Sequence, residues 1–164
     1  MKAVDTNILA RFFVDDPDDA EATLQKPLAI KAMSQSVFVS LPVVLELEWV
    51  MRGFYELPCE SISQVLKALC GLENVTIEHR ETLLTAVDAY EKNLDCTDAL
   101  HLAHAKHCRV FVSFDKKLHK NAHNAKLLPI VEIPTLRQIF YQINLIKLNS
   151  HAGSTKRRLL SNRN

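Results

Sequence analysis

Short apolar stretches alternate with longer helical segments along most of the chain, and this alternation restricts the fold more than any other feature. The apolar stretches are rich in β-branched and aromatic residues and occupy positions 1–4, 37–40, 75–77, 109–113 and 130–133. Between them, apolar residues recur at helical spacing, as Leu83, Leu84 and Val87 do. Strands that alternate with helices pair in parallel through crossovers. The pattern predicts a three-layer α/β/α fold with a small central parallel sheet and more helix than strand.

The helical segments are predicted from their apolar spacing and from the residues at their ends. We expect helices at 8–14, 17–33, 43–55, 61–72, 80–94, 96–107 and 134–148. Asp16 is expected to cap the second of these, because Pro17 suits a first helical turn. Pro27 should break or kink the same helix.

Composition excludes several classes of protein. The chain has 164 residues, enough for one domain with its own core, and only three glycines. No glycine-rich phosphate-binding motif occurs, which argues against nucleotide sites of that kind. No apolar run is long enough to span a membrane and no signal peptide is evident, so we expect a cytoplasmic protein. The four cysteines form no C-x-x-C pair and are expected to be reduced packing residues.

Charge is distributed unevenly along the chain. No acidic residue follows Glu132, whereas six basic residues do, and the preceding part carries a formal net charge of −5. A basic tail can contact nucleic acid, but for residues 150–164 a solvated, disordered terminus is the simpler interpretation.

Four carboxylates lie either at the end of a predicted strand or within an apolar helical stretch. Asp5 and Asp115 each follow a strand, so parallel pairing would bring both to one edge of the sheet. Glu46 and Asp98 each lie in an apolar helical stretch, where a lone buried charge would cost several kcal/mol. Carboxylates brought together repel one another. A hard divalent cation such as Mg²⁺ or Mn²⁺ would resolve this repulsion.

The segments that carry these acids resemble the four signature blocks of PIN-domain ribonucleases. The blocks are V-D-T-N-I-L at 4–9, L-E-L-E-W-V at 45–50, D-C-T-D-A-L-H-L-A at 95–103 and V-S-F-D at 112–115. Their order and rough spacing are most similar to those of VapC-type toxins of bacterial toxin–antitoxin pairs. The resemblance implies that Asp5, Glu46, Asp98 and Asp115 are the catalytic acids and that Asp5 and Asp98 bind metal. It gives supporting positions to Thr6, Asn7, Asp95 and Ser113.

The resemblance also implies an activity, partners and a division of the chain. It implies Mg²⁺- or Mn²⁺-dependent endonucleolytic cleavage of RNA, a homodimer, and neutralisation by a cognate antitoxin. Any contact with DNA would be indirect, through the antitoxin. We expect a PIN-like nuclease domain over residues 1–134, a helix packed on it or at an interface over 135–149, and the tail over 150–164. The alternative function is a PIN-like module that binds RNA or a partner without catalysis. Phosphatase and receiver folds fit less well, because the acids that they require are absent.

Several site residues have a purely structural interpretation. Asp5 could cap the first helix, although Thr6 is expected to take that role once Asp5 is a ligand, and Asp115 could cap the helix after it. Glu48 is expected to face solvent or form a salt bridge, with Glu46 as the site acid. Trp49 is expected in the core or at a dimer interface. The histidines complete no metal motif: His101 and His104 are expected in packing or at the surface, and His119 and His123 in an exposed loop.

Overall fold

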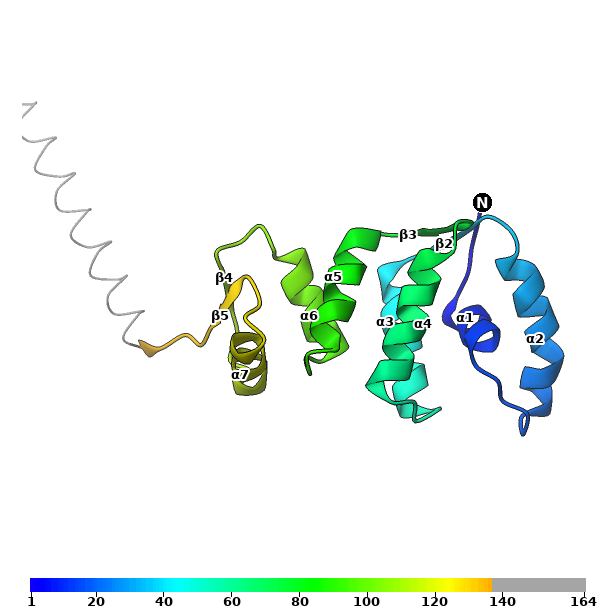
Figure 1. Cartoon of the computed structure of the whole chain (residues 1–164), viewed down its shortest axis with the longest axis horizontal. Helices are drawn as coiled ribbons and strands as arrows, with labels where there is room; N and C mark the ends of the chain where they lie inside the picture. The colour runs from blue at the N-terminus through cyan, green and yellow to red at the C-terminus, as the bar shows by residue number, and fades with distance from the viewer. Residues whose placement is uncertain (137–164) are drawn as a thin grey trace, which may run out of the picture.

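The computed structural model describes residues 1–136, within which seven helices and five short strands follow one another (Figure 1). The predicted helix at 134–148 and the tail at 150–164 lie almost entirely outside the described residues. The elements are β1 (Lys2–Ala3), α1 (Thr6–Phe13), α2 (Ala20–Met33), β2 (Val37–Val39), α3 (Leu41–Gly53), α4 (Cys59–Gly71), β3 (Val75–Ile77), α5 (Arg80–Tyr90), α6 (Cys96–His104), β4 (Val110–Val112), α7 (Lys116–Asn124) and β5 (Ile130–Glu132).

The strands pair in parallel, as expected from their alternation with helices. β1, β2 and β3 form one sheet in that order, in which Val37 pairs with both Lys2 and Val75. β4 and β5 form a second sheet, with Phe111 opposite Val131. The prediction of a mixed α/β fold with parallel strands and more helix than strand is confirmed. The strands of the described part, however, lie in two sheets rather than in one, so Asp5 and Asp115 do not share a sheet edge.

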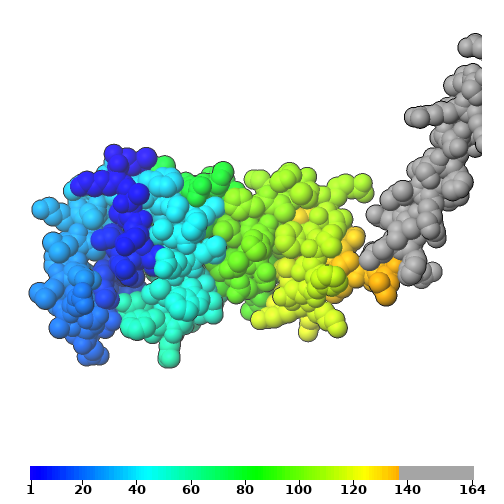
Figure 2. Space-filling view, turned by 180° about the vertical axis from the view of Figure 1, so that it is seen from behind, coloured from blue at the N-terminus to red at the C-terminus, as the bar shows by residue number. Residues whose placement is uncertain are grey.

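The core runs through the helices that pack below the three-stranded sheet in Figure 1. Its largest fully buried side chains include Leu47 and Met51 of α3, Ile62 and Leu66 of α4, and Leu83 of α5. Burying one such side chain stabilises the fold by roughly 1.5–3 kcal/mol. Within residues 1–136, the amino-terminal elements and the β4–α7–β5 unit lie toward opposite ends (Figures 1 and 2).

The second helix differs from its prediction at its start and in its middle. α2 begins at Ala20 and is capped by Asp19, whose side chain accepts hydrogen bonds from the backbone N–H groups of Glu21 and Ala22. The prediction of Asp16 as the cap is therefore wrong. Pro27 is exposed and lies inside α2, which continues to Met33, so the expectation that it would break the helix is wrong.

Some side-chain environments also differ from expectation. Trp49 is 63% exposed, so it does not belong to the core. His119 and His123 lie on helix α7 rather than in a loop. All four cysteines are free, as predicted, but only Cys70 and Cys96 are buried packing residues. No helix within residues 1–136 is both long enough and apolar enough to cross a membrane.

Candidate active site

Asp5 stands between β1 and α1 and caps the helix. Its backbone is extended, with φ −96° and ψ 179°, and its Oδ1 accepts a hydrogen bond of 3.1 Å from the backbone N–H of Ile8. This bond occupies one carboxylate oxygen, and the second can bind another group. The expectation that Thr6 would cap α1 is therefore wrong.

Thr6 instead joins α1 to α3. Its side chain is 4% exposed, and its Oγ1 donates a hydrogen bond of 2.5 Å to Oε2 of Glu46. Glu46 is itself exposed on α3. A buried donor thus fixes the position of an exposed carboxylate at the start of α1, the helix that Asp5 caps. We call Asp5 and Glu46 the α1–α3 acidic pair.

Glu48 has a different environment although it lies only two residues from Glu46. It is 3% exposed, and its Oε1 accepts hydrogen bonds from Nε of Arg52 at 2.7 Å and from the hydroxyl of Tyr90 at 3.1 Å. The bond to Glu48 raises the pKa of Arg52, and burial, followed by the charge of Glu48, raises the pKa of Tyr90. Of the two expectations for Glu48, the salt bridge is confirmed and the solvent-facing position is wrong.

Asp98 belongs to a second group of acids around helix α6. Burial raises the pKa of Asp98, and the carboxylates of Asp95 and Asp115 raise it further, whereas His101 and Lys117 oppose the shift. A carboxylate whose pKa is raised by its surroundings gains from a nearby cation. We call Asp95, Asp98 and Asp115 the α6–α7 acidic group.

The other two members of this group are helix caps. Asp95 accepts a hydrogen bond of 2.9 Å from the backbone N–H of Thr97 at the start of α6. Asp115 accepts from the backbone N–H groups of Lys117 at 2.7 Å and Leu118 at 3.0 Å at the start of α7. Ser113 supports this turn, because its Oγ accepts from the backbone N–H of Asp115 at 3.0 Å. Asp115 therefore does cap the following helix.

The two acidic groups are not joined into one site within the described chain. β1 and β4 belong to different sheets, and the charges that act most on the pKa of Asp98 are those of Asp95, Asp115, His101 and Lys117. Among residues 1–136, no set of three or more His, Cys, Asp or Glu side chains is arranged to hold a metal ion. Carboxylates are the donors that Mg²⁺ and Mn²⁺ prefer. The donor types therefore fit a divalent metal, but their arrangement in a single chain does not.

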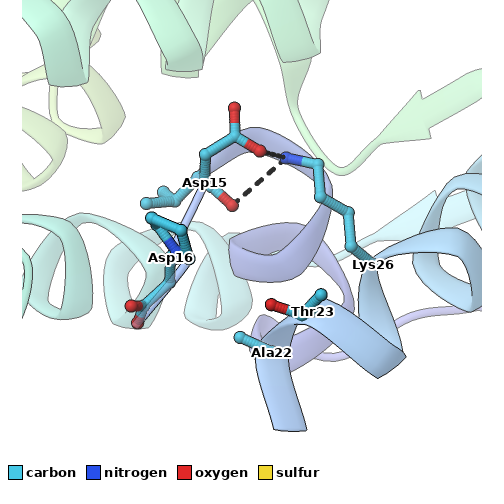
Figure 3. Close-up of a pocket in the computed structure, with 7 residues that line it drawn as sticks. Asp15, Asp16, Ala22, Thr23 and Lys26 are labelled. Carbon is cyan, nitrogen blue, oxygen red and sulfur yellow. Dashed lines mark hydrogen bonds and ion pairs between the residues drawn. The ribbon is translucent and has the colours of Figure 1, made fainter. Parts of the chain in front are cut away.

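Polar contacts that the sequence did not predict surround the loop between α1 and α2. The loop encloses a hollow of about 280 Å³. In Figure 3 the amino group of Lys26, one of its lining residues, points to the carboxylate of Asp15, and it also donates to the carbonyl of Val14 at 3.3 Å. Nearby, Arg11 contacts Asp19 at 3.1 Å and the hydroxyl of Tyr55 at 2.8 Å. The contact between Arg11 and Tyr55 links α1 to a residue far along the sequence, whereas the others close the α1–α2 loop.

A comparison with known protein families shows to which family the chain belongs. The PIN domain family model matches residues 2–124. The chain belongs to the PIN domain family. The match includes the segments that carry Asp5, Glu46, Asp98 and Asp115, and it supports nuclease activity in general. It does not distinguish VapC-type toxins from other PIN domains, and no curated protein or solved structure matches the chain.

Proposed function

We propose that this PIN domain is a ribonuclease that hydrolyses RNA phosphodiester bonds and requires Mg²⁺ or Mn²⁺. The observation that carries the proposal is the family match, since it spans every segment in which a catalytic acid is expected. Asp5, Glu46, Asp98 and Asp115 are the proposed catalytic acids, and Asp5 and Asp98 the proposed metal ligands. Thr6 and Ser113 hold neighbouring groups in place through their hydroxyl oxygens. Asn7, exposed in the first turn of α1, is proposed as a supporting residue.

Helix α7 offers a surface for the RNA backbone beside one of these acids. Lys116, Lys117 and Lys120 are exposed, and Lys116 and Lys117 directly follow Asp115. Cations close to the acidic residues would offset their repulsion of the phosphates and bring the strand within reach. Because phosphate contacts carry no sequence information, these lysines would set affinity rather than the choice of RNA.

The central experiment measures RNA cleavage by the purified protein with Mg²⁺, with Mn²⁺ and with EDTA. We expect cleavage with either metal and none with EDTA. Asp5→Asn and Asp98→Asn should abolish cleavage, whereas Asp18→Asn, which alters an exposed acid in the α1–α2 loop, should leave it unchanged. Cleavage that survives EDTA and both site substitutions would contradict the proposal.

We further propose that the enzyme is the VapC-type toxin of a toxin–antitoxin pair and forms a homodimer. The support is the similarity of the four sequence blocks to those of such toxins. Expression should arrest growth, Asp5→Asn should relieve the arrest, and a small protein encoded next to the gene should neutralise the wild-type chain. Growth arrest by the Asp5→Asn variant as well would contradict a toxic action through RNA cleavage.

One observation favours a second candidate, a PIN-like module that binds RNA or a partner without cutting it. Within the described chain the acids lie in two groups and do not complete a metal site. The same experiment distinguishes the candidates, because a binding module would retain RNA affinity in the wild-type chain and show no cleavage with either metal.

A further inference from the structure

The sheet of β4 and β5 is covered on one face. Phe111 and Val131 lie opposite each other in the register, so their side chains point to the same face. Val131 is 5% exposed, and Phe111 stacks on His101 of α6 with ring centroids 6.5 Å apart. Helix α7, whose Leu118 and Ala122 are buried, packs against β5. We call this covered side of the sheet the inner face.

The opposite side, which we call the outer face, is apolar and open. The residues next to Phe111 and Val131 point to it, because side chains alternate along a strand. Val112 of β4 is 64% exposed and Ile130 of β5 is 58% exposed, so no element of residues 1–136 covers them. Sheets of parallel strands are normally covered on both faces. The outer face therefore lacks a layer that a parallel sheet requires.

The chain that follows β5 can supply this layer. β5 ends at Glu132, and three residues later the backbone is helical at Leu136, the last described residue. From there to residue 148, apolar residues recur three or four positions apart, which is the spacing of one helix face. These residues are Leu136, Ile139, Phe140, Ile143 and Ile146. The sequence thus provides an apolar helix face directly after the sheet that needs one.

Length and connection favour the outer face over other exposed apolar surfaces. A helix of 13 residues is about 20 Å long, and a strand of three residues is about 10 Å long. Residues 136–148 are therefore long enough to cross both strands, and a short connection makes consecutive elements neighbours in space. Leu24 and Leu28 of α2 are also exposed, but α2 lies toward the other end of residues 1–136 (Figures 1 and 2).

We propose that residues 136–148, which we call the C-terminal segment, form a helix that packs on the outer face of β4 and β5 in the same chain. Ile139, Phe140 and Ile143 face the sheet in this arrangement. Their partners there are Val112 and Ile130. Only the first residue of the C-terminal segment is described, so the proposal rests on the exposed outer face, the short connection and the apolar spacing. The segment is then the missing layer of the domain and not a free arm for a partner.

The added layer supports the strand that leads to Asp115. The N–H of Ser113 donates to the carbonyl of Glu132 in β5 at 3.0 Å, and Oγ of Ser113 accepts from the N–H of Asp115 at 3.0 Å. A helix that holds β5 against β4 therefore also stabilises the turn in which Asp115 lies. The packing does not depend on the proposed nuclease function, and it is tested without RNA.

Disulfide formation tests which side of the C-terminal segment meets the sheet. Val112→Cys is combined in turn with Ile139→Cys, Phe140→Cys or Ile143→Cys, in a chain whose two exposed native cysteines are replaced by serine. A disulfide requires the two Cβ atoms to approach within about 4.5 Å. At least one of the three pairs should therefore form a disulfide within a single chain under mild oxidation.

The matched controls place the second cysteine on the polar side of the same segment. Val112→Cys with Gln138→Cys, or with Gln142→Cys, should stay reduced under the same conditions. Disulfides that join two chains would show that a second copy covers the outer face and would overturn the proposal. So would the absence of any disulfide with the three facing positions, or equal yields with the controls.

Hydrogen exchange tests the same packing in the unmodified chain. In the wild-type protein the C-terminal segment should exchange its amide hydrogens more slowly than a synthetic peptide of residues 136–148, at every protein concentration. Ile139→Asp together with Ile143→Asp should speed exchange in the segment and in β4 and β5 by at least about tenfold, because two buried apolar side chains are lost. Gln138→Asp together with Gln142→Asp adds the same charge at the same spacing and should change neither.

Exchange in helix α3 shows in each variant that the rest of the domain is folded. A wild-type segment that exchanges as fast as the peptide would overturn the proposal. Protection that appears only at high protein concentration would assign the outer face to a second copy and would also overturn it. The same conclusion follows if the isoleucine substitutions leave β4 and β5 unchanged, or if the glutamine substitutions have an equal effect.

Discussion

Glu46 and Glu48 lie two residues apart on α3, and the structure predicts opposite consequences when each is replaced. Glu48→Ala removes the acceptor of the buried Tyr90 hydroxyl and of the Arg52 guanidinium. Leaving a buried polar group without a partner costs about 1–3 kcal/mol, and a hydrogen bond to a charged group contributes about 1.5–3 kcal/mol. Arg52 is 49% exposed and regains water, so its loss is the smaller one.

We therefore expect Glu48→Ala to lower the free energy of unfolding by about 2–4 kcal/mol. In a chain of this length, that corresponds to a Tm lower by roughly 4–16 °C. Glu46→Ala removes an exposed side chain and one hydrogen bond from Thr6, which should cost about 1 kcal/mol. RNA cleavage should show the reverse order: Glu46→Ala loses activity, and Glu48→Ala retains it at temperatures where it is folded.

Urea unfolding followed by circular dichroism measures the first effect, and cleavage at a temperature well below both transitions measures the second. Tyr90→Phe provides a matched control, since it removes only the hydroxyl, and its effect should not add to that of Glu48→Ala. A Glu48→Ala protein as stable as wild type would refute the assignment of Glu48 to the core. A folded Glu48→Ala protein without activity, beside an active Glu46→Ala protein, would show that the site acid is Glu48.

Three further predictions concern stability and accessibility. Hydrogen bonds from the backbone of Ala22 and Glu21 and the charge of Arg11 lower the pKa of Asp19. The contribution of Asp19 to stability is therefore present above about pH 4 and is lost as the pH falls through its lowered pKa. The difference in Tm between wild type and Asp19→Ala should shrink accordingly in scans from pH 6 to pH 2. Pro27→Ala restores a helical N–H inside α2 and should raise the stability by about 1–3 kcal/mol in urea unfolding, and a lower stability would show that the ring makes compensating contacts. Burial raises the pKa of Cys96 to about 12 and also raises that of Cys70, so a thiol reagent at pH 8 should react rapidly with only two thiols of the folded chain and with all four after unfolding.

Local patterns predicted the elements of this fold well. β2 and β3 occupy the expected stretches because β-branched and aromatic residues concentrate there, and α5 begins at Arg80 as its apolar spacing indicated. The errors lie at helix ends. Pro17 favoured Asp16 as the cap, whereas in the structure Asp19 caps the helix and also contacts Arg11 of α1. Pro27 does not end α2, although it removes one helical N–H, so the contacts of the rest of the helix outweigh this local cost.

Sheet assembly is the part of the fold that the sequence could not provide. Alternating strands and helices predict parallel pairing, but not which strands become neighbours, because pairing depends on how the helices between them pack. Here Phe111 and Leu118 pack β4 and α7 against α6 and the core, and the second sheet forms away from β1. The prediction that Asp5 and Asp115 share a sheet edge depended on a single sheet and therefore does not hold within the described chain.

The roles of helix cap and site acid are compatible at Asp5 and Asp115, although they are alternatives when only the sequence is considered. Each of these carboxylates accepts backbone hydrogen bonds through Oδ1, which fixes the direction of Oδ2. A cap of this kind contributes about 0.5–2 kcal/mol, and it reduces the cost of holding a negative charge next to others because the helix N-terminus is positive. Substitution by asparagine keeps the capping oxygen and removes the charge, whereas alanine removes both. If these acids are catalytic, the asparagine variants lose cleavage while keeping nearly the wild-type Tm. If a residue only caps its helix, its asparagine variant keeps both cleavage and Tm, and its alanine variant has a lower Tm.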